Sequence, residues 1–207
     1  MKHAVRPPHR FDQPALVTIR CVGTAPSLRS EILARAITAQ IARAVRRGIG
    51  VVHYSIQDNH LHLMVEAADK QRLARGMQLL FSRIAFEVNR LAQRHGRLFR
   101  DRHHRRALTN PTQTRNALVY VLFNGRKHRL QKGDAPSHIL TWIDPCSSAA
   151  WFEGWSADYA PTRTLLERTR AGPCVRGAEP TTWLAREGWT RGGGPIRYDE
   201  VPRMPRV

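Results

Sequence analysis

The order of strand-like and helix-like segments constrains the fold more than any other feature of this 207-residue chain. Runs of apolar, β-branched residues predict strands, whereas apolar residues at i, i+4 spacing predict helices. The expected strands cover 15–22, 51–56 and 60–66, with a fourth extended, basic segment at 97–108. The expected helices cover 29–47, 69–95 and 111–124, ending at Gly48, Gly96 and Gly125.

This order is β-α-β-β-α-β followed by one further helix, which is the ferredoxin-like, split βαβ arrangement. It predicts an α+β fold with a four-stranded antiparallel sheet. Two helices should cover one face of the sheet, and the other face should stay open unless something else covers it.

Positive charge is concentrated in the same part of the chain. The formal net charge is +18. Residues 1–145 hold 25 Lys and Arg against 9 Asp and Glu, a net of +16, whereas residues 146–207 hold 9 against 7, a net of +2. The first part is therefore expected to bind a polyanion, most simply nucleic acid.

Two histidines alternate along the strand expected at 60–66. Since side chains in a strand point to opposite faces in turn, Leu61 and Leu63 should face the helices, and His60 and His62 should share the open face. Neutral imidazoles are common ligands of divalent metals, so the pair could bind one ion if a third ligand joined it. The plain alternative is a pair of solvated or hydrogen-bonded histidines.

The last expected helix carries a second candidate group. Tyr120 and Asn124 stand four residues apart, hence on one helix face. A tyrosine beside a metal-activated phosphate is a competent nucleophile, and the Asn124 amide oxygen could complete the coordination. Taken singly, Tyr120 also suits a core position, and Asn124 before Gly125 also suits a helix end.

Basic residues flank these groups and are candidates for phosphate contacts, which position a strand without reading its sequence. One cluster alternates in the extended segment, and the other directly follows the tyrosine. The expected DNA-binding residues are Arg97, Arg100, Arg102, Arg105 and Arg106 in the first cluster, and Arg126 and Lys127 in the second. The alternative is a solvated edge that serves solubility.

Taken together, these motifs resemble the single-tyrosine HUH transposases, especially the REP-associated tyrosine transposases, over about residues 11–130. The matching pieces are Asn59-His60-Leu61-His62-Leu63, the basic segment from Gly96 to Arg106, and Tyr120-Val121-Leu122-Phe123-Asn124. Relatives usually continue with Asn-Pro after the tyrosine helix, whereas Gly125 follows Asn124 here. The resemblance implies an HUH transposase-like catalytic domain at 11–130.

The resemblance also implies a chemistry. A divalent cation, Mg²⁺ or Mn²⁺, held by His60, His62 and Asn124 would polarise a phosphate of single-stranded DNA. Tyr120 would attack it, leaving a 5′-phosphotyrosine and a free 3′-hydroxyl, and the strand would later be rejoined. Implied partners are hairpin-forming single-stranded DNA and a second copy of the chain, since many members are dimers whose tyrosine helices complete each other's sites.

Other functions remain open or are excluded. A non-catalytic, domesticated protein of the same fold would bind DNA or RNA hairpins through arginines and aromatic stacking. A histidine-triad hydrolase would need a third alternating histidine where Met64 stands, and a metallo-β-lactamase-like nuclease needs an Asp-His pair that 63–65 lacks.

Residues 146–207 form a Pro/Gly/Trp-rich C-terminal extension. Its expected structure is short helices at 161–170 and 180–188 joined by loops, with tryptophans anchored on the core or on a partner. The apolar runs predict no transmembrane helix or signal peptide. Three widely spaced cysteines, Cys21, Cys146 and Cys174, fit a reducing cytoplasm, where a DNA-binding protein would associate with the nucleoid.

Overall fold

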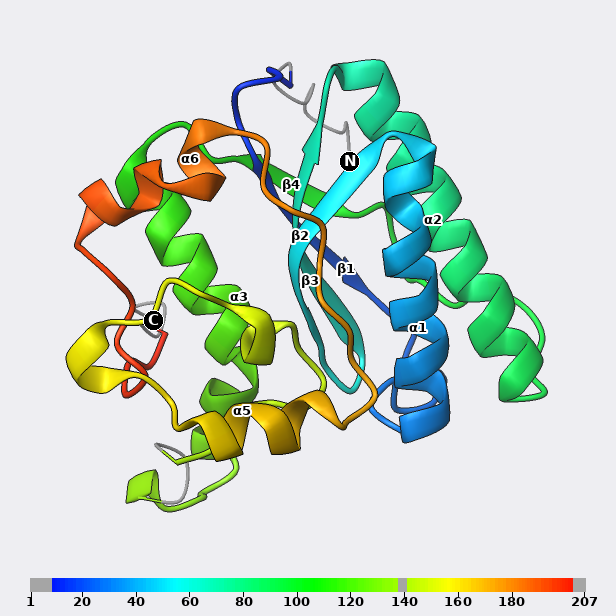
Figure 1. Ribbon diagram of the computed structural model, residues 1–207. Helices are drawn as coiled ribbons and strands as arrows, with labels where there is room; N and C mark the ends of the chain where they lie inside the picture. The colour runs from blue at the N-terminus through cyan, green and yellow to red at the C-terminus, as the bar shows by residue number, and fades with distance from the viewer. Residues whose placement is uncertain (1–8, 138–140, 203–207) are drawn as a thin grey trace.

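The computed structural model describes residues 9–137 and 141–202 and is built around a four-stranded antiparallel sheet (Figure 1). Across the sheet the strands are β2 (Ile49–Ile56), β3 (His60–Ala67), β1 (Ala15–Arg20) and β4 (His104–Ala107). β1 pairs antiparallel with β3 on one side and with β4 on the other. The ferredoxin-like order expected from the sequence is thereby confirmed.

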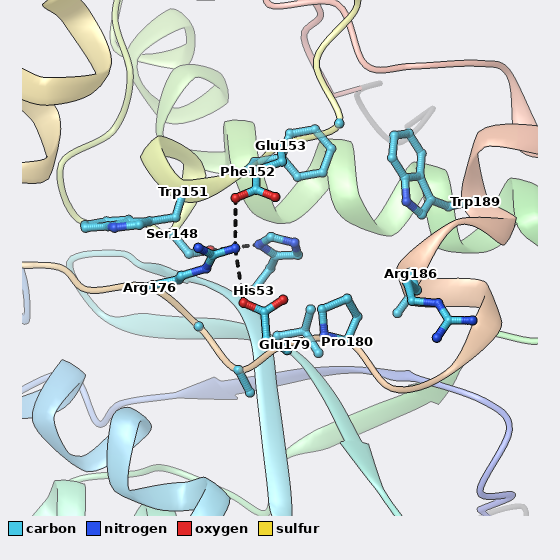
Figure 2. A pocket seen from close by; sticks show the side chains of 15 residues that line it. His53, Ser148, Trp151, Phe152, Glu153, Arg176, Glu179, Pro180, Arg186 and Trp189 are labelled. Atoms are coloured by element: carbon cyan, nitrogen blue, oxygen red, sulfur yellow. Dashed lines mark hydrogen bonds and ion pairs between the residues drawn. The ribbon is translucent and has the colours of Figure 1, made fainter. Parts of the chain in front are cut away.

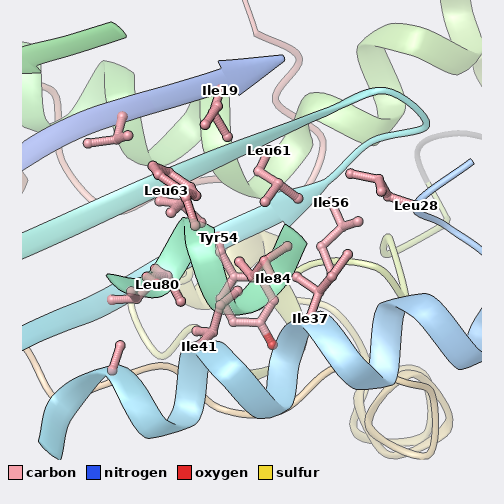
Figure 3. Close-up of a cluster of buried hydrophobic side chains, with 14 of the residues drawn as sticks. Ile19, Leu28, Ile37, Ile41, Tyr54, Ile56, Leu61, Leu63, Leu80 and Ile84 are labelled. Carbon is pink, nitrogen blue, oxygen red and sulfur yellow. The ribbon is translucent and has the colours of Figure 1, made fainter. Parts of the chain in front are cut away.

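Two helices, α1 (Glu31–Ala44) and α2 (Lys70–Leu91), cover one face of the sheet. Their apolar stripes meet the apolar side of β3 in the main core (Figure 3), formed by Ile37 and Ile41 of α1, Leu80 and Ile84 of α2, and Leu61 and Leu63 of β3. Because side chains alternate along β3, this packing turns His60 and His62 to the opposite face.

The two helices end for different reasons. After α1, one 3-10 turn (Val45–Arg47) leads to Gly48, whose φ of +80° makes the expected glycine stop. α2 ends at Leu91, short of the predicted end at Gly96, because Gln93 already takes a left-handed φ of +48°. β4 is likewise short, so Arg97, Arg100 and Arg102 lie in the loop before it.

The tyrosine helix is longer than predicted. α3 (Pro111–Gln131) begins at Asn110, whose side chain accepts a hydrogen bond from the backbone of Gln113. The predicted end at 124 is wrong: Gly125 is helical, and a Cβ there would collide with the buried Asp144. Gly125 thus serves close packing rather than helix termination. In the described chain, every helix is too short or too polar to cross a lipid bilayer.

The face expected to be open is covered by α3 and the C-terminal extension (Figure 1). The extension contains the expected short helices, α5 (Arg163–Arg170) and α6 (Trp183–Arg186). A second core joins them to the sheet, with Met64 of β3, Leu118 and Leu122 of α3, and Phe152, Trp189 and Ile196 of the extension. The sheet is therefore sandwiched between two apolar layers.

Buried polar contacts fasten the extension to this core. The Glu66 carboxylate on β3 accepts four hydrogen bonds from the backbone and hydroxyl groups of Thr181 and Thr182, at 2.6–3.0 Å. Asp144 accepts two from the guanidinium of Arg29, at 2.7 and 3.0 Å. Both carboxylates are almost fully buried, so each contact is costly to break. The Glu66 contact holds the extension to the sheet, and the Asp144 contact holds the segment just before the extension to the loop before α1.

The extension also runs along the outer edge of β2. Ala178 donates a backbone hydrogen bond of 2.8 Å to the carbonyl of Val51. Gly177 lies so close to the backbone of Val52 that a Cβ would collide with its carbonyl. In Figure 1 this segment is the orange trace that passes beside β2.

Candidate active site

The two histidines of β3 face α3 and are buried, with His60 7% and His62 3% exposed. On the neighbouring strand β1, Thr18 stands directly opposite His62, and Arg20 stands opposite His60. The rings of the two histidines meet edge to face with centroids 4.7 Å apart. The structure thus brings the predicted pair together on the predicted face.

A neighbouring side chain holds each imidazole through Nδ1. Nδ1 of His60 lies 2.8 Å from Oδ1 of Asn59, and Nδ1 of His62 lies 2.8 Å from the hydroxyl of Thr18. An amide oxygen only accepts, so Nδ1 of His60 carries the proton and its Nε2 keeps a free lone pair. The Thr18 hydroxyl can accept from the same tautomer of His62, in which Nε2 keeps its lone pair beside the Tyr120 hydroxyl.

Burial keeps both imidazoles neutral. It lowers the pKa of His60 to about 4, and the nearby charges of His128 and Arg20 add to the shift. Burial also lowers the pKa of His62 well below its ordinary value of 6.5, with His60 contributing. Neutral imidazoles can accept a hydrogen bond or bind a cation at neutral pH.

α3 presents three side chains on successive turns to this pair. The hydroxyl of Tyr120 lies 3.2 Å from Nε2 of His62, with ring centroids 4.7 Å apart. Two turns later, the ring of His128 lies 5.5 Å from that of His60. Asn124 stands between them on the same helix face, so it faces the histidine pair.

Asn124 has the properties of an unused ligand. Its side chain is 1% exposed, and within the described residues neither its amide oxygen nor its amide nitrogen has a hydrogen-bond partner. Buried amides are nearly always satisfied, so an orphaned one points to a missing group. No third His, Cys, Asp or Glu in 9–137 and 141–202 forms a metal-binding group with the histidines. His60, His62 and the unpartnered amide of Asn124 thus remain the candidate donors for a divalent cation.

Sequence reasoning missed two members of this site. Thr18 reaches His62 only because β1 and β3 pair in this register, which no local pattern reveals. His128 lay beyond the predicted helix end, although its spacing of eight residues from Tyr120 would have placed it on the same face of a longer helix.

The predicted DNA-binding residues lie in different environments. Arg106 stands opposite Leu16 on β1 and shares the histidine face, whereas Arg105 stands opposite Val17 and points to the other face. Arg97, Arg100 and Arg102 are exposed in the loop before β4, away from the predicted strand alternation. Their contacts with DNA stay predictions.

Arg126 requires a correction. It is 1% exposed, and its guanidinium donates hydrogen bonds to the carbonyls of Trp142, Tyr198 and Glu200. Burial lowers its pKa to about 10. The prediction that Arg126 contacts DNA is wrong, because its side chain points into the protein and anchors the extension. Its neighbour Lys127 is partly exposed, with Nζ 5.7 Å from the centre of the Tyr120 ring.

A cavity of about 280 Å³ lies between β2 and the extension, away from these groups (Figure 2). Arg176 projects across it and forms ion pairs with Glu153 and Glu179, at 2.8 and 3.1 Å. His53 contacts the hydroxyl of Ser148 at 3.2 Å in its wall. Since the charge of Arg176 is matched by two carboxylates, this cavity does not suit a phosphate.

The fold and the site thus combine a ferredoxin-like sheet with two neutral imidazoles on one face, which lie beside a tyrosine and a buried amide of the helix that covers that face. No model of a protein family matches the chain, and no curated protein does. Among solved structures, the chain is similar to a REP-associated tyrosine transposase bound to a REP hairpin. The likeness covers 72% of this chain and 82% of that one, with a TM-score of 0.51 and 14% identity. It shows that the two proteins share a fold.

Proposed function

We propose that this protein is a divalent-cation-dependent DNA strand transferase that cleaves and rejoins single-stranded DNA, with Tyr120 as nucleophile. The observation that carries the proposal is the 3.2 Å approach of the Tyr120 hydroxyl to Nε2 of His62, beside the unpartnered amide of Asn124. The shared fold with a tyrosine transposase supports it. Each feature alone has a structural explanation, but together they form a nucleophile next to a ligand set.

The chain's own residues account for the reaction as follows. The oxygen of Tyr120 forms a bond to the scissile phosphorus while the bond from phosphorus to the 3′ oxygen breaks. The phenol proton passes to solvent, and the departing 3′ oxygen takes up a proton to become a hydroxyl. The 5′ end stays bonded to Tyr120, so attack by a 3′-hydroxyl reverses the step and rejoins a strand.

Thr18 and Asn59 hold the histidines through Nδ1, which leaves both Nε2 atoms free to bind the cation. When bound by His60, His62 and Asn124, Mg²⁺ or Mn²⁺ would supply Lewis-acid polarisation of that phosphate. Lys127, beside the tyrosine ring, provides positive charge for the approaching strand.

The proposed substrate is hairpin-forming single-stranded DNA, by analogy with the hairpin-bound neighbour and in accord with the +16 charge of residues 1–145. Dimerisation is part of the proposal, as is association with the nucleoid through DNA binding. Within one chain, Tyr120 already contacts His62.

The test is incubation with single-stranded hairpins from the gene's own flanks and Mn²⁺, followed by denaturing electrophoresis. Wild type should form a covalent protein–DNA adduct, and Tyr120→Phe should form none. Tyr159→Phe, which alters a half-exposed tyrosine of the extension, is the matched control and should retain the adduct. Adducts in Tyr120→Phe would show that the nucleophile is another residue. Tight hairpin binding by wild type without any adduct would favour the non-catalytic binding function.

A further inference from the structure

A groove of about 720 Å³ lies directly beside Tyr120. One wall consists of β1, β4 and α3, and includes Arg106, Asn116 and Tyr120 itself. The opposite wall belongs to the C-terminal extension, through Gly192, Gly193 and the stretch from Glu200 to Pro202. Its volume is within the range of roughly 300–1,000 Å³ that is typical of sites for small-molecule ligands.

The extension is built firmly into this wall. The Arg115 guanidinium on α3 donates to both carboxylate oxygens of Glu200, at 2.5 and 3.1 Å, and to the carbonyls of Gly194 and Pro195, at 2.9 and 3.2 Å. The ion pair is largely shielded from water, with side chains 13% and 21% exposed. Arg126 holds the same stretch from the interior through the carbonyls of Tyr198 and Glu200.

The glycine run has a role in this arrangement. Gly192 lies so close to the backbone of Pro111 that a Cβ would collide with it. Gly193 and Gly194 have φ of +139° and +76°, a region that other residues rarely adopt. The chain can therefore pass the start of α3 closely and turn along the groove.

The chemistry of the two walls differs. Arg106 and His104 on β4 are exposed and face the groove, whereas the charge of Arg115 is matched by Glu200. On the side of the extension, the exposed Val201 offers apolar surface. An exposed arginine and an exposed apolar side chain lining the same groove match an unpaired nucleotide, which presents both a phosphate and a base.

We propose that residues 192–202 form a wall of the groove that holds the unpaired nucleotides next to the phosphate attacked by Tyr120. This inference rests on the function proposed above and adds that the extension is part of the substrate site. It also accounts for the near-neutral charge of the extension, since its contribution is shape and apolar contact rather than attraction of phosphates.

The test changes charge at Val201, with Val175 as control. Both valines belong to the extension and are 39% exposed, but Val175 does not line the groove. Binding is measured by fluorescence anisotropy in EDTA, with a hairpin carrying a single-stranded arm and with the same hairpin blunt. Val201→Glu should weaken binding of the armed hairpin by about fivefold, because it places a negative charge in a groove that would hold a negatively charged strand. Val201→Lys should strengthen it, and the blunt hairpin should respond to neither.

Val175→Glu and Val175→Lys change the net charge equally, so they should shift both hairpins alike and only slightly. If the Val201 and Val175 variants behave alike, the groove proposal is overturned, whether or not Tyr120 forms adducts. If the Val201 variants respond as expected while wild type forms no adduct, the groove proposal stands and the strand-transfer function fails.

Discussion

The hydroxyl of Tyr120 rests 3.2 Å from Nε2 of His62, the same atom that a divalent cation would use. In the proposed site, the nucleophile and the cation would therefore compete for one lone pair. Binding of an ion would displace the hydroxyl and free the tyrosine to approach a phosphate.

This competition predicts that Tyr120→Phe binds Mn²⁺ more tightly than wild type. Removing one neutral hydrogen bond of about 1 kcal/mol should raise the affinity by about fivefold. Isothermal titration calorimetry without DNA measures the affinity, and His62→Ala, which lacks a proposed ligand, should abolish binding. A weaker affinity in Tyr120→Phe would mean that the hydroxyl supports the ion instead of competing with it.

Asn124→Leu should change the stability of the protein differently in the absence and in the presence of the ion. In EDTA the variant should be as stable as wild type or more stable, by up to about 1–2 kcal/mol, because it removes a buried amide without partners. With Mn²⁺ present, wild type should gain stability and the variant should gain little. Urea unfolding in both conditions tests this, and a loss of stability in EDTA would show that the amide is satisfied in the apo protein.

Thr18 should act as a positioning residue. Thr18→Val keeps the shape but removes the hydrogen bond to Nδ1 of His62, so Mn²⁺ affinity should fall by about tenfold or more. Thr18→Ser retains a hydroxyl and should keep the Mn²⁺ affinity of wild type. Equal affinities in the two variants would indicate that Thr18 only fills space.

Arg126 and Lys127 are adjacent but should respond differently to replacement. Arg126→Met leaves three carbonyls without their donor and should lower the free energy of unfolding by about 3 kcal/mol. Lys127→Met should change stability by less than about 0.5 kcal/mol and should lower the salt dependence of DNA binding by about one phosphate contact. Chemical denaturation measures the stability of each variant, and salt titrations of DNA binding measure the number of phosphate contacts. If Arg126→Met stays folded and its DNA binding depends less on salt than that of wild type, Arg126 does contact DNA.

Stability should fall in mild acid, and His53 is the clearest cause. Burial, with Arg176 adding, lowers the pKa of His53 from 6.5 to about 4. The folded state therefore binds fewer protons than the unfolded state, so stability is full above about pH 6.5 and is lost as pH falls toward 4. For His53 the complete loss amounts to about 3 kcal/mol.

Urea unfolding at about pH 7, above that window, and at about pH 5, within it, measures this loss of stability. His53→Gln should show a smaller loss between the two pH values than wild type, whatever its stability at neutral pH. Identical losses would assign the acid sensitivity to other groups, such as His60 and His62.

The fold could be predicted from the sequence because it depends on local periodicity. Alternation in β3 was sufficient to place His60 and His62 opposite the apolar side, and helical spacing was sufficient to place Asn124 one turn after Tyr120. Both relationships involve residues of one element, whose geometry is nearly constant.

Contacts between distant segments could not be predicted in the same way. Gly125 was expected to end the helix because glycine commonly does, but its packing partner Asp144 is 19 residues further along. Arg126 belongs to a basic run and was expected at the surface, yet helix rotation turns it inward while Lys127 stays outside. Its carbonyl partners come from the extension, whose path no periodicity indicates.

The segment that runs along β2 has a consequence for assembly. An uncovered edge strand is a template on which a second chain can extend a sheet. Here Ala178 already occupies the carbonyl of Val51, and Gly177 lies against Val52, so an incoming strand would first have to displace the extension. Two copies therefore cannot merge their sheets through β2 while the extension stays in place. A variant in which the extension detaches from β2 would expose that edge and would be more prone to aggregation.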